Sequence, residues 1–390
     1  MKIAFFCDAY RPTRSGVAVS VETTSEELRR RGHHVTIFAP RYKGFVETDE
    51  RVVQFPAGHW FRARDFPVAW PLLPRASLFA EARFRREDFD IVHSHSPFTI
   101  GTVGARWARS CGIPLVFTFH TLYHRYLHYV PAPSAWTRSY IVWWVREYCA
   151  LCDHIIAPSR PVSQIVARLS PGIPHSVLST GIDVTRFASG SRNRGREKHN
   201  IGEDELVLLY VGRIVKEKNL AFLFHSLAPL LRDEELLKGR KLRLMMVGGG
   251  PALEFLQALA EQLNIADKVI FTGFVEPSST PDLYAASDLF VFASRTETQG
   301  VSIAEALAAG LPCVVVGAMG AAEAITDSRE GFVVPPREDA FRHAVKRLIE
   351  NATLRDQMAH AARLKAPQLS QQHSVDALLK LYEKMIKRGA

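Results

Sequence analysis

The sequence predicts an α/β protein with two parallel sheets, each covered by helices on both faces. Apolar runs without polar alternation recur along the 390 residues, which is typical of strands buried on both sides. Helix-length segments separate these runs, and strands alternating with helices predict doubly wound parallel sheets. The chain has ten or more such strands, more than one sheet comfortably holds, so two domains are expected.

The expected strands are shared evenly between the two halves of the chain. In the first half, strands are expected at 2–7, 34–39, 90–95, 114–120 and 154–159, and helices at 17–31, 134–152 and 161–169. In the second half, a helical stretch follows each strand, and the strands are at 206–213, 242–249, 268–274, 289–294 and 312–317. A last helix is predicted over 370–388. Its apolar face holds Val375, Leu378, Leu379, Tyr382 and Met385.

The domain boundary is expected in the segment Gly190–Asn200, which has many charges and no hydrophobic residue. Such composition is typical of a linker between domains. Two Rossmann-like domains, 1–189 and 190–371, would then face each other across a cleft. The last helix could pack on either of them.

The composition excludes several classes of protein. With 47% hydrophobic and 23% charged residues, the chain is neither disordered nor fibrous. No run approaches the roughly 18 apolar residues of a membrane span, and the first residues are interpreted as a strand rather than a signal peptide. A cytoplasmic protein is therefore expected. The five cysteines do not suggest a disulfide framework, and Cys149 and Cys152 are assigned to helix packing.

The positive charge is concentrated in the first half. Residues 1–190 carry 23 Lys and Arg against 15 Asp and Glu, a net +8, whereas residues 191–390 carry 26 against 25, a net +1. This asymmetry favours an anionic partner, either a membrane or a nucleic acid. The alternative is that the arginines only keep the protein soluble.

In open parallel sheets, ligands bind beyond the carboxyl ends of the strands. At the carboxyl end of the strand at 206–213, Arg213 and the nearby Lys218 could reach a pair of phosphates from one loop. The glycines Gly248–Gly250 follow the next strand, where they either admit a ligand or form a tight turn.

The segment from Glu297 to Glu305 is the most specific signal in the chain. Gly300 is expected to open a helix whose free N–H groups suit a phosphate. Carboxylates repel phosphates but accept hydrogen bonds from sugar hydroxyls. Two carboxylates beside a phosphate site therefore predict a sugar nucleotide as ligand.

The first half offers two further candidates. His120 stands at the carboxyl end of the strand at 114–120, in the expected cleft. Its role there is either catalytic or structural. Gly16 opens the first helix and would let a phosphate approach the backbone. Asp88 and Asp90 are placed in a helix-to-strand connection, and the pair His93 and His95 is assigned a structural role because it lacks a third metal ligand.

Together these residues resemble the retaining GT-B glycosyltransferases of sequence family 4 over the whole chain. The motifs are the S-G-V loop, T-F-H-T at 118–121, A-P-S at 157–159, S-T-G-I-D at 179–183, V-G-R-x4-K-N at 211–219 and E-T-Q-G-x4-E at 297–305. Within that family, the run from His120 to Pro131 resembles the diacylglycerol glucosyltransferases. This chain has His124 where those enzymes often have an acidic residue.

The resemblance implies a role for each residue on the donor side. Arg213 and Lys218 would hold the pyrophosphate, and Glu305 the ribose. Glu297 and the backbone of Thr298, Gln299, Gly300 and Val301 would bind the sugar, while Val275, after Phe274, would meet the base. His120 would contact the sugar, Gly16 would approach the phosphate or the acceptor, and a helix at about 372–390 would cross back to the first domain.

The expected chemistry follows from the charge that develops on the leaving diphosphate. Two cations and the helix start at Gly300 oppose that charge, so neither a metal nor a cofactor is expected. Double displacement needs a second carboxylate roughly 5 Å away, and no clear pair is present. A same-face substitution is therefore preferred.

Aromatic residues and arginines alternate in the segment 59–86, which suits a membrane interface. The residues assigned to membrane or acceptor are Trp60, Phe61, Arg62, Arg64, Phe66, Trp70 and Tyr126. A second aromatic group includes Trp136, Tyr140, Trp143 and Trp144. The alternative for both groups is packing in the core.

The expected function is transfer of a hexose from a nucleotide sugar to a membrane lipid such as diacylglycerol, at the inner face of the cell membrane. UDP and glucose come only from the resemblance. The alternative is a soluble or polyprenyl-linked acceptor, and a nucleotide-sugar epimerase ranks below both. The chain has no G-x-G-x-x-G and no P-loop motif, which disfavours a dehydrogenase or a nucleotide hydrolase. Nucleic acid is not expected as a partner, because it would leave both carboxylates unexplained.

Overall fold

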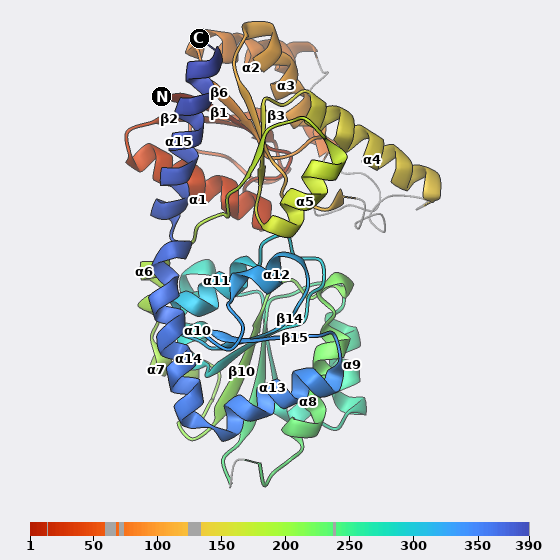
Figure 1. The fold of residues 1–390 in the computed structure, drawn as a ribbon, viewed down its shortest axis with the longest axis vertical. Helices are drawn as coiled ribbons and strands as arrows, with labels where there is room; N and C mark the ends of the chain where they lie inside the picture. Colours follow the sequence, from red (N-terminus) through yellow and green to blue (C-terminus); the bar gives the residue numbers. More distant parts are fainter. Residues whose placement is uncertain (14, 59–67, 70–73, 124–133, 237–238, 390) are drawn as a thin grey trace. The chain divides into compact units, whose positions relative to one another are not determined.

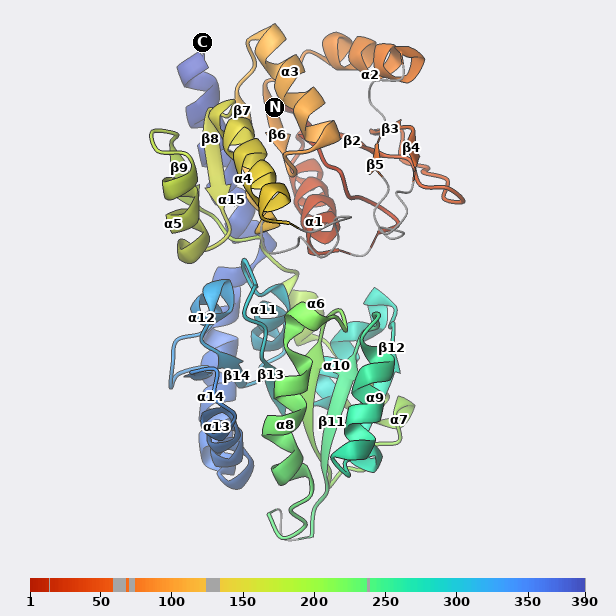
Figure 2. The ribbon, with the colours of Figure 1, turned by 90° about the vertical axis from the view of Figure 1, so that its right-hand side faces the viewer.

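The computed structural model describes residues 1–13, 15–58, 68–69, 74–123, 134–236 and 239–389. The chain forms two compact units (Figure 1): unit 1 comprises Met1–Gly181 and Gln371–Ala390, and unit 2 comprises Ile182–Ser370. Each unit has one large parallel sheet with helices on both faces (Figure 2). This confirms the predicted α/β class with two Rossmann-like sheets.

Unit 1 has a seven-stranded sheet in the order β3-β2-β1-β6-β7-β8-β9. Its strands are β1 (Lys2–Phe6), β2 (His34–Pro40), β3 (Val52–Phe55), β6 (Ile91–Ser94), β7 (Leu115–Thr118), β8 (His154–Ala157) and β9 (His175–Val177), and a separate pair is formed by β4 (Ala57–Gly58) and β5 (Val68–Ala69). The helices are α1 (Gly16–Arg30), α2 (Pro74–Glu87), α3 (Thr99–Cys111), α4 (Ala135–Ala150), α5 (Arg160–Leu169) and α15 (Gln371–Gly389). Asp88 and Asp90 connect α2 to β6, as expected.

The two faces of this sheet are packed differently. On one face, aromatic rings from strands and helices interlock, with the Phe6 and Phe38 rings stacked at 4.4 Å and Trp107 of α3 edge-on to both. On the other face, α1 and α15 cover the strands. The buried face of α15 is the predicted one, with Val375, Leu378, Tyr382 and Met385 in the core and Leu379 at its margin.

Unit 2 has a six-stranded sheet in the order β12-β11-β10-β13-β14-β15. Its strands are β10 (Leu206–Val211), β11 (Leu242–Val247), β12 (Val269–Gly273), β13 (Leu289–Phe292), β14 (Cys313–Val316) and β15 (Gly331–Val334). Its helices are α6 (Val184–Ala188), α7 (Arg192–Lys198), α8 (Leu220–Leu231), α9 (Leu253–Gln262), α10 (Thr280–Ala286), α11 (Val301–Ala308), α12 (Met319–Ala324), α13 (Glu338–Glu350) and α14 (Ala352–Lys365). Short 3-10 turns are η3 (Lys216–Lys218), η4 (Ala266–Lys268), η5 (Pro277–Ser279) and η6 (Ala366–Leu369).

The segment expected to link two domains is part of unit 2 instead. Residues 192–198 form α7, and the units divide at Gly181 and Ile182 rather than at 189 and 190. Arginines take the place of apolar anchors here, because Arg194 pairs with Asp282 of α10 and the buried Arg196 donates to the Ala286 carbonyl oxygen at 3.1 Å. A charged segment without hydrophobic residues is therefore not always a linker.

Candidate active site

The carboxyl ends of neighbouring strands in unit 2 form one continuous edge. The N–H of Gly212, after β10, donates to the Val247 carbonyl oxygen at 3.0 Å. The N–H of Gly248, after β11, donates to the Gly273 carbonyl oxygen at the end of β12, also at 3.0 Å. The loops carrying the predicted donor-binding residues therefore start side by side, at the edge where parallel sheets bind ligands.

The glycines after β11 are explained by close packing of the backbone. Gly248 has φ +128°, and a Cβ there would lie 2.1 Å from the Gly212 carbonyl oxygen. At Gly250 (φ +157°) a Cβ would lie 2.3 Å from the Ile214 carbonyl oxygen. Of the two roles open for these glycines, the structure gives a tight turn, and that turn supports the loop that carries Arg213.

Lys218 and Glu297 meet across this edge. The ammonium of Lys218, in η3, forms an ion pair with the carboxylate of Glu297, in the loop between β13 and α11. The hydroxyl of Tyr210 donates to the Arg213 carbonyl oxygen at 3.1 Å. Burial raises the pKa of Tyr210, the Glu297 charge raises it further and the Arg213 charge lowers it. The predicted cations and one predicted carboxylate are therefore gathered around Tyr210.

The start of α11 has the backbone geometry expected of an anion site. Gly300 is the N-cap in the left-handed region, at φ 85°, and as a glycine it offers no side chain to cap the helix. The preceding loop is held in place by α12, since the Gly320 N–H donates to the Glu297 carbonyl oxygen at 2.9 Å. A Cβ at Gly320 would lie 2.2 Å from the Thr298 carbonyl oxygen. The loop backbone is thus positioned before any ligand binds.

Glu305 lies on the second turn of α11 and is held by a residue that the sequence analysis did not find. The hydroxyl of Tyr284, in α10, donates to a Glu305 carboxylate oxygen at 2.7 Å. Desolvation raises the pKa of Glu305 to about 7, against the opposing effects of the Tyr284 hydrogen bond and the Arg186 charge. No motif marks Tyr284, because only the fold brings α10 beside α11.

Phe274 and Val275 follow β12 at the same edge. The Phe274 side chain is 74% exposed, and its ring lies over Gly249, where a Cβ would come within 2.5 Å of it. An exposed phenyl ring over a glycine turn leaves a flat apolar surface, which suits stacking of a planar ring.

In unit 1, the half-buried His120 stands at the end of a line of histidine rings whose other members, His93 and His95, are buried. Its Nε2 lies 3.0 Å from His95 Nδ1, and the two rings stack with centroids 5.3 Å apart. The next ring, His93, lies 2.7 Å from the Thr118 hydroxyl and 2.5 Å from the hydroxyl of Tyr382 in α15. Burial lowers the pKa of His120 to about 4 and that of His93 to about 3. His93 and His95 are structural, as predicted, and His95 directly contacts the candidate catalytic side chain.

Asp8 is a second residue that the sequence analysis did not find. It follows β1, and its carboxylate accepts hydrogen bonds from the Thr99 hydroxyl at 2.6 Å and the Ile100 N–H at 2.9 Å. It therefore caps α3, whose own N-cap, Phe98, offers no polar side chain. This capping secures the strand ends that flank His95.

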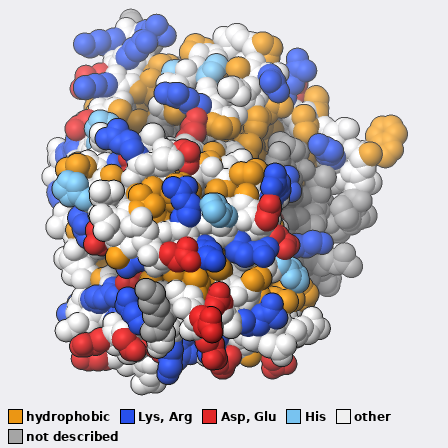
Figure 3. Space-filling view, turned by 60° about the horizontal axis from the view of Figure 1, so that its bottom comes forward, with side chains coloured by type: hydrophobic (Ala, Val, Ile, Leu, Met, Phe, Trp, Pro, Cys, Tyr) orange, Lys and Arg blue, Asp and Glu red, His pale blue; other side chains and the backbone are white. Residues whose placement is uncertain are grey.

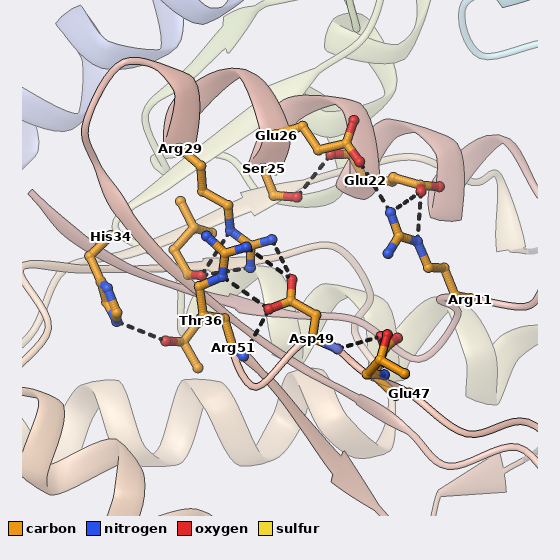
Figure 4. A network of polar contacts seen from close by, with 12 residues as sticks. Arg11, Glu22, Ser25, Glu26, Arg29, His34, Thr36, Glu47, Asp49 and Arg51 are labelled. Carbon is orange, nitrogen blue, oxygen red and sulfur yellow. Dashed lines mark hydrogen bonds and ion pairs between the residues drawn. The ribbon is translucent and has the colours of Figure 1, made fainter.

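Gly16 starts α1, and within the described residues a Cβ at this position would have no neighbour within 4 Å. The approach to this helix is fixed by ion pairs (Figure 4). Arg11 donates to Glu22 at 2.6 Å and to Glu26 at 3.1 Å. Further along α1, Arg29 pairs with Asp49 at 2.8 Å. Packing within the described residues does not require a glycine at 16. The close approach of a phosphate or an acceptor to Gly16 therefore stays a prediction.

The residues assigned to membrane or acceptor lie outside the described residues. These are Trp60, Phe61, Arg62, Arg64, Phe66, Trp70 and Tyr126. In the part of the chain that is described, no group of three or more His, Cys, Asp or Glu side chains converges on a metal position. None of the described helices is both long enough and apolar enough to cross a bilayer.

Comparison with known proteins decides the family. Residues 14–186 match Glycosyltransferase Family 4, and residues 191–365 match Glycosyl transferases group 1. The chain is 32% identical over 323 residues to the alpha-monoglucosyldiacylglycerol synthase of Streptococcus pneumoniae, covering 81% of this chain and 71% of that enzyme. The chain is a family 4 glycosyltransferase.

Other relatives of this glycosyltransferase are named for different activities. A GDP-mannose-dependent alpha-mannosyltransferase of Mycobacterium tuberculosis is 29% identical over 357 residues, which is 88% of each chain. Among solved structures, Anabaena HepE in complex with UDP has a TM-score of 0.78 at 19% identity, covering 98% of this chain and 100% of that one. These neighbours confirm the GT-B fold that the motifs implied.

Glu305→Gln should stabilise this glycosyltransferase above pH 7 while weakening donor binding. The folded-state pKa of Glu305 is about 7, raised from 4.5 by desolvation. Between those pH values the folded protein holds a proton that the unfolded chain has lost, so its stability falls as the pH rises. Glutamine removes this loss, and the variant should have the higher melting temperature at pH 8. Because an amide accepts fewer hydrogen bonds from hydroxyls than a carboxylate, nucleotide-sugar affinity should fall about tenfold.

Thermal unfolding across pH and calorimetric titration with the nucleotide sugar measure both effects. Glu254→Gln, at an exposed position on α9, is the control and should change neither. A melting temperature at pH 8 that is lower for Glu305→Gln than for the unmodified transferase would contradict the prediction.

Gly248→Ala should destabilise the transferase by about 2–4 kcal/mol, from the positive φ and the overlap with the Gly212 carbonyl. The displaced Gly212–Arg213 loop should also raise KM for the nucleotide sugar. Gly273→Ala is the matched control, because it has a positive φ of 66° but nothing within 4 Å of the added Cβ among the described residues. Urea unfolding measures the difference, and equal loss in both variants would rule out the steric argument.

Proposed function

We propose that this glycosyltransferase moves glucose from UDP-glucose to a membrane lipid of the diacylglycerol type, with retention at the anomeric carbon. The observation that carries the donor half is the ion pair of Lys218 with Glu297 at the carboxyl edge of the unit 2 sheet, in the loop that leads to the Gly300 start of α11. The acceptor half rests on the relatives that make glucosyldiacylglycerol.

Each donor residue has a role in this proposal. Arg213 and Lys218 bind the diphosphate, and the Glu305 carboxylate accepts hydrogen bonds from the ribose hydroxyls while Tyr284 holds it. Glu297 and the backbone of 298–301 bind the sugar hydroxyls. The Phe274 ring and the Val275 backbone meet the base. His120 acts on the sugar as a neutral hydrogen-bonding group, consistent with its lowered pKa.

The reaction is a substitution on one face of the sugar. The bond from the anomeric carbon to the β-phosphate oxygen breaks, and a bond from that carbon to the acceptor oxygen forms. The acceptor's proton passes to the departing phosphate oxygen, so UDP leaves with it. Negative charge grows on the diphosphate as the bond breaks, and the two cations together with the helix start stabilise it. These groups supply the charge that a metal ion provides in other transferases, so the proposed reaction is independent of metal and of any resident cofactor.

The proposal places the enzyme at the cytoplasmic face of the cell membrane, bound to its anionic surface and not to nucleic acid. Unit 1 is the basic one, with 26 Lys and Arg against 16 Asp and Glu, a net +10, whereas unit 2 has 23 against 24, a net −1. The second candidate is transfer to a soluble or polyprenyl-linked acceptor, and its soluble form is favoured by the relatives named D-inositol 3-phosphate glycosyltransferase.

The deciding experiment incubates the purified protein with UDP-glucose and anionic liposomes, with and without diacylglycerol. UDP release together with a new glycolipid, only when diacylglycerol is present, is the expected result. UDP release without a glycolipid would keep the donor and discard the lipid. If UDP-glucose fails but GDP-mannose reacts, the donor assignment is wrong. A covalently trapped sugar in a Glu297→Gln variant would overturn the same-face substitution.

A further inference from the structure

The contacts that join α4 to the rest of unit 1 within the described residues lie in its C-terminal half. In its last turns, Val145, Tyr148 and Cys149 are buried. The Tyr148 hydroxyl donates to the Gly101 carbonyl oxygen at 3.1 Å, and the Trp144 indole N–H donates to the Pro97 carbonyl oxygen at 2.8 Å. Gly101 lies in the first turn of α3 and Pro97 just before that helix, so the C-terminal half of α4 is fixed to unit 1. Figure 1 shows the other half extending away from the unit 1 sheet.

The N-terminal part of α4 displays a stripe of large aromatic side chains. Trp136, Tyr140 and Trp143 follow one another at intervals of four and three residues, which places them on one face of a helix. Their exposed fractions are 87%, 58% and 51%. The Tyr140 and Trp143 rings lie 5.7 Å apart. In Figure 3, hydrophobic side chains project at the right-hand edge, where Figure 1 has α4. Contiguous exposed aromatics of this kind mark an interaction surface.

The positive charge on α4 favours an anionic partner for the aromatic stripe. Between residues 91 and 152 the chain has five arginines and a single carboxylate, Glu147. Two of those arginines, Arg138 and Arg146, line a groove along α4 together with Val142 and Trp143. Guanidinium groups beside indole rings match the headgroup layer of a bilayer, where phosphates meet the first methylene groups.

We propose that the aromatic stripe of α4, Trp136, Tyr140 and Trp143, docks this protein on an anionic lipid bilayer. The rings enter the interface between headgroups and acyl chains, and Arg138 and Arg146 bind lipid phosphates beside them. This inference rests on the proposed function, because a lipid acceptor gives the enzyme a reason to reside at a membrane. It assigns the docking to a helix outside the aromatic and arginine segment at 59–86.

The test measures binding to liposomes of phosphatidylglycerol and phosphatidylcholine, without diacylglycerol and without nucleotide sugar. The variant Trp136→Ala/Tyr140→Ala/Trp143→Ala should bind about tenfold or more weakly, since three large rings no longer leave water. Alanine favours helix, so the fold should survive, and a thermal melt checks it. The control is Phe255→Ala, which removes a ring 59% exposed on α9 of unit 2. Unchanged liposome binding by the triple variant would overturn the proposal.

The charge contribution has its own variant. Arg138→Gln/Arg146→Gln should weaken binding to anionic liposomes severalfold and leave the weak binding to pure phosphatidylcholine unchanged. Raising the salt from about 0.05 M to about 0.5 M should reduce binding of the unmodified protein, because the Debye length shortens. Equal affinity for neutral and anionic liposomes would exclude a contribution from the net negative charge of the bilayer.

Tryptophan quenching by brominated lipids identifies the segment that inserts. The protein has six tryptophans, so its quenching should drop sharply in Trp136→Phe/Trp143→Phe if α4 inserts. Undiminished quenching would move the contact to another segment. If the triple alanine variant instead converts an oligomer to a monomer in the absence of liposomes, the stripe binds a second copy of the chain and the proposal fails.

These results are independent of the proposed reaction. Liposome binding that needs α4, with no glycolipid from any donor, would keep the docking surface and refute the proposed function. Glycolipid synthesis that is unchanged in the α4 variants would keep the proposed function and refute the docking surface.

Discussion

Lys218→Gln is expected to lower kcat by about 100- to 1,000-fold and to change KM for the nucleotide sugar far less. In the free protein this ammonium is paired with the Glu297 carboxylate, and both side chains are mostly buried. During the reaction the diphosphate gains negative charge as the glycosidic bond breaks. A group that stabilises charge only as it develops contributes to kcat rather than to KM.

The control is the neighbouring Lys216, which is exposed in the same 3-10 turn. Lys216→Gln removes an equal charge at nearly the same place and should keep its rate within about twofold. Steady-state kinetics of both variants separate a local role from a general electrostatic one. Similar losses in the two variants would show that Lys218 acts only through net charge.

The partnership with Glu297 makes a second variant informative. If Lys218 and Glu297 act as one unit, the double variant Lys218→Gln/Glu297→Gln should lose less than the product of the two single losses. Strictly multiplicative losses would mean that the ion pair of the free protein plays no part in catalysis.

His120→Ala is expected to reduce kcat/KM by about 100-fold without altering the shape of the pH profile. With its pKa lowered to about 4 by burial, His120 is neutral throughout the range in which the enzyme would be assayed. The acid limb should instead follow Glu305, whose pKa is about 7. Below that pH the protonated carboxyl group accepts fewer hydrogen bonds from the ribose, so the apparent donor affinity falls.

A pH series of kcat/KM for three variants checks this assignment. Glu305→Gln should lose the acid limb, His120→Ala should keep it at a lower rate, and His343→Ala, at an exposed position on α13, should match the unmodified enzyme. Loss of the acid limb in His120→Ala would mean that His120 titrates in this range and that its surroundings do not lower its pKa to about 4.

The interior strands were predictable because burial on both faces leaves a continuous apolar run. All ten predicted runs contain a strand of the structure. The strands of the two large sheets that were missed, β3, β9 and β15, each lie at the edge of a sheet and have three or four residues. A short edge strand is covered less completely, and its composition differs little from that of a loop.

The candidate site could be predicted where one local segment carries several of its residues. Glu297, Gly300 and Glu305 lie within one loop and helix, so their spacing was informative. Contacts between residues far apart in the sequence could not be predicted, because only the folded chain brings those residues together. Lys218 and Glu297 are 79 residues apart, and His93 and Tyr382 are 289 apart. Tyr284 belongs to the same class, since nothing near it in the sequence indicates a partner on α11.

The return of α15 to unit 1 has a consequence for how the protein is made. Unit 2 is one continuous stretch of chain, whereas unit 1 needs residues from both sides of it. During translation, unit 2 therefore has all its residues before unit 1 does, although unit 1 begins first. His93 meets the Tyr382 hydroxyl only after the ribosome has synthesised α15. The histidines of unit 1 thus acquire their final surroundings last, when unit 2 can already be folded.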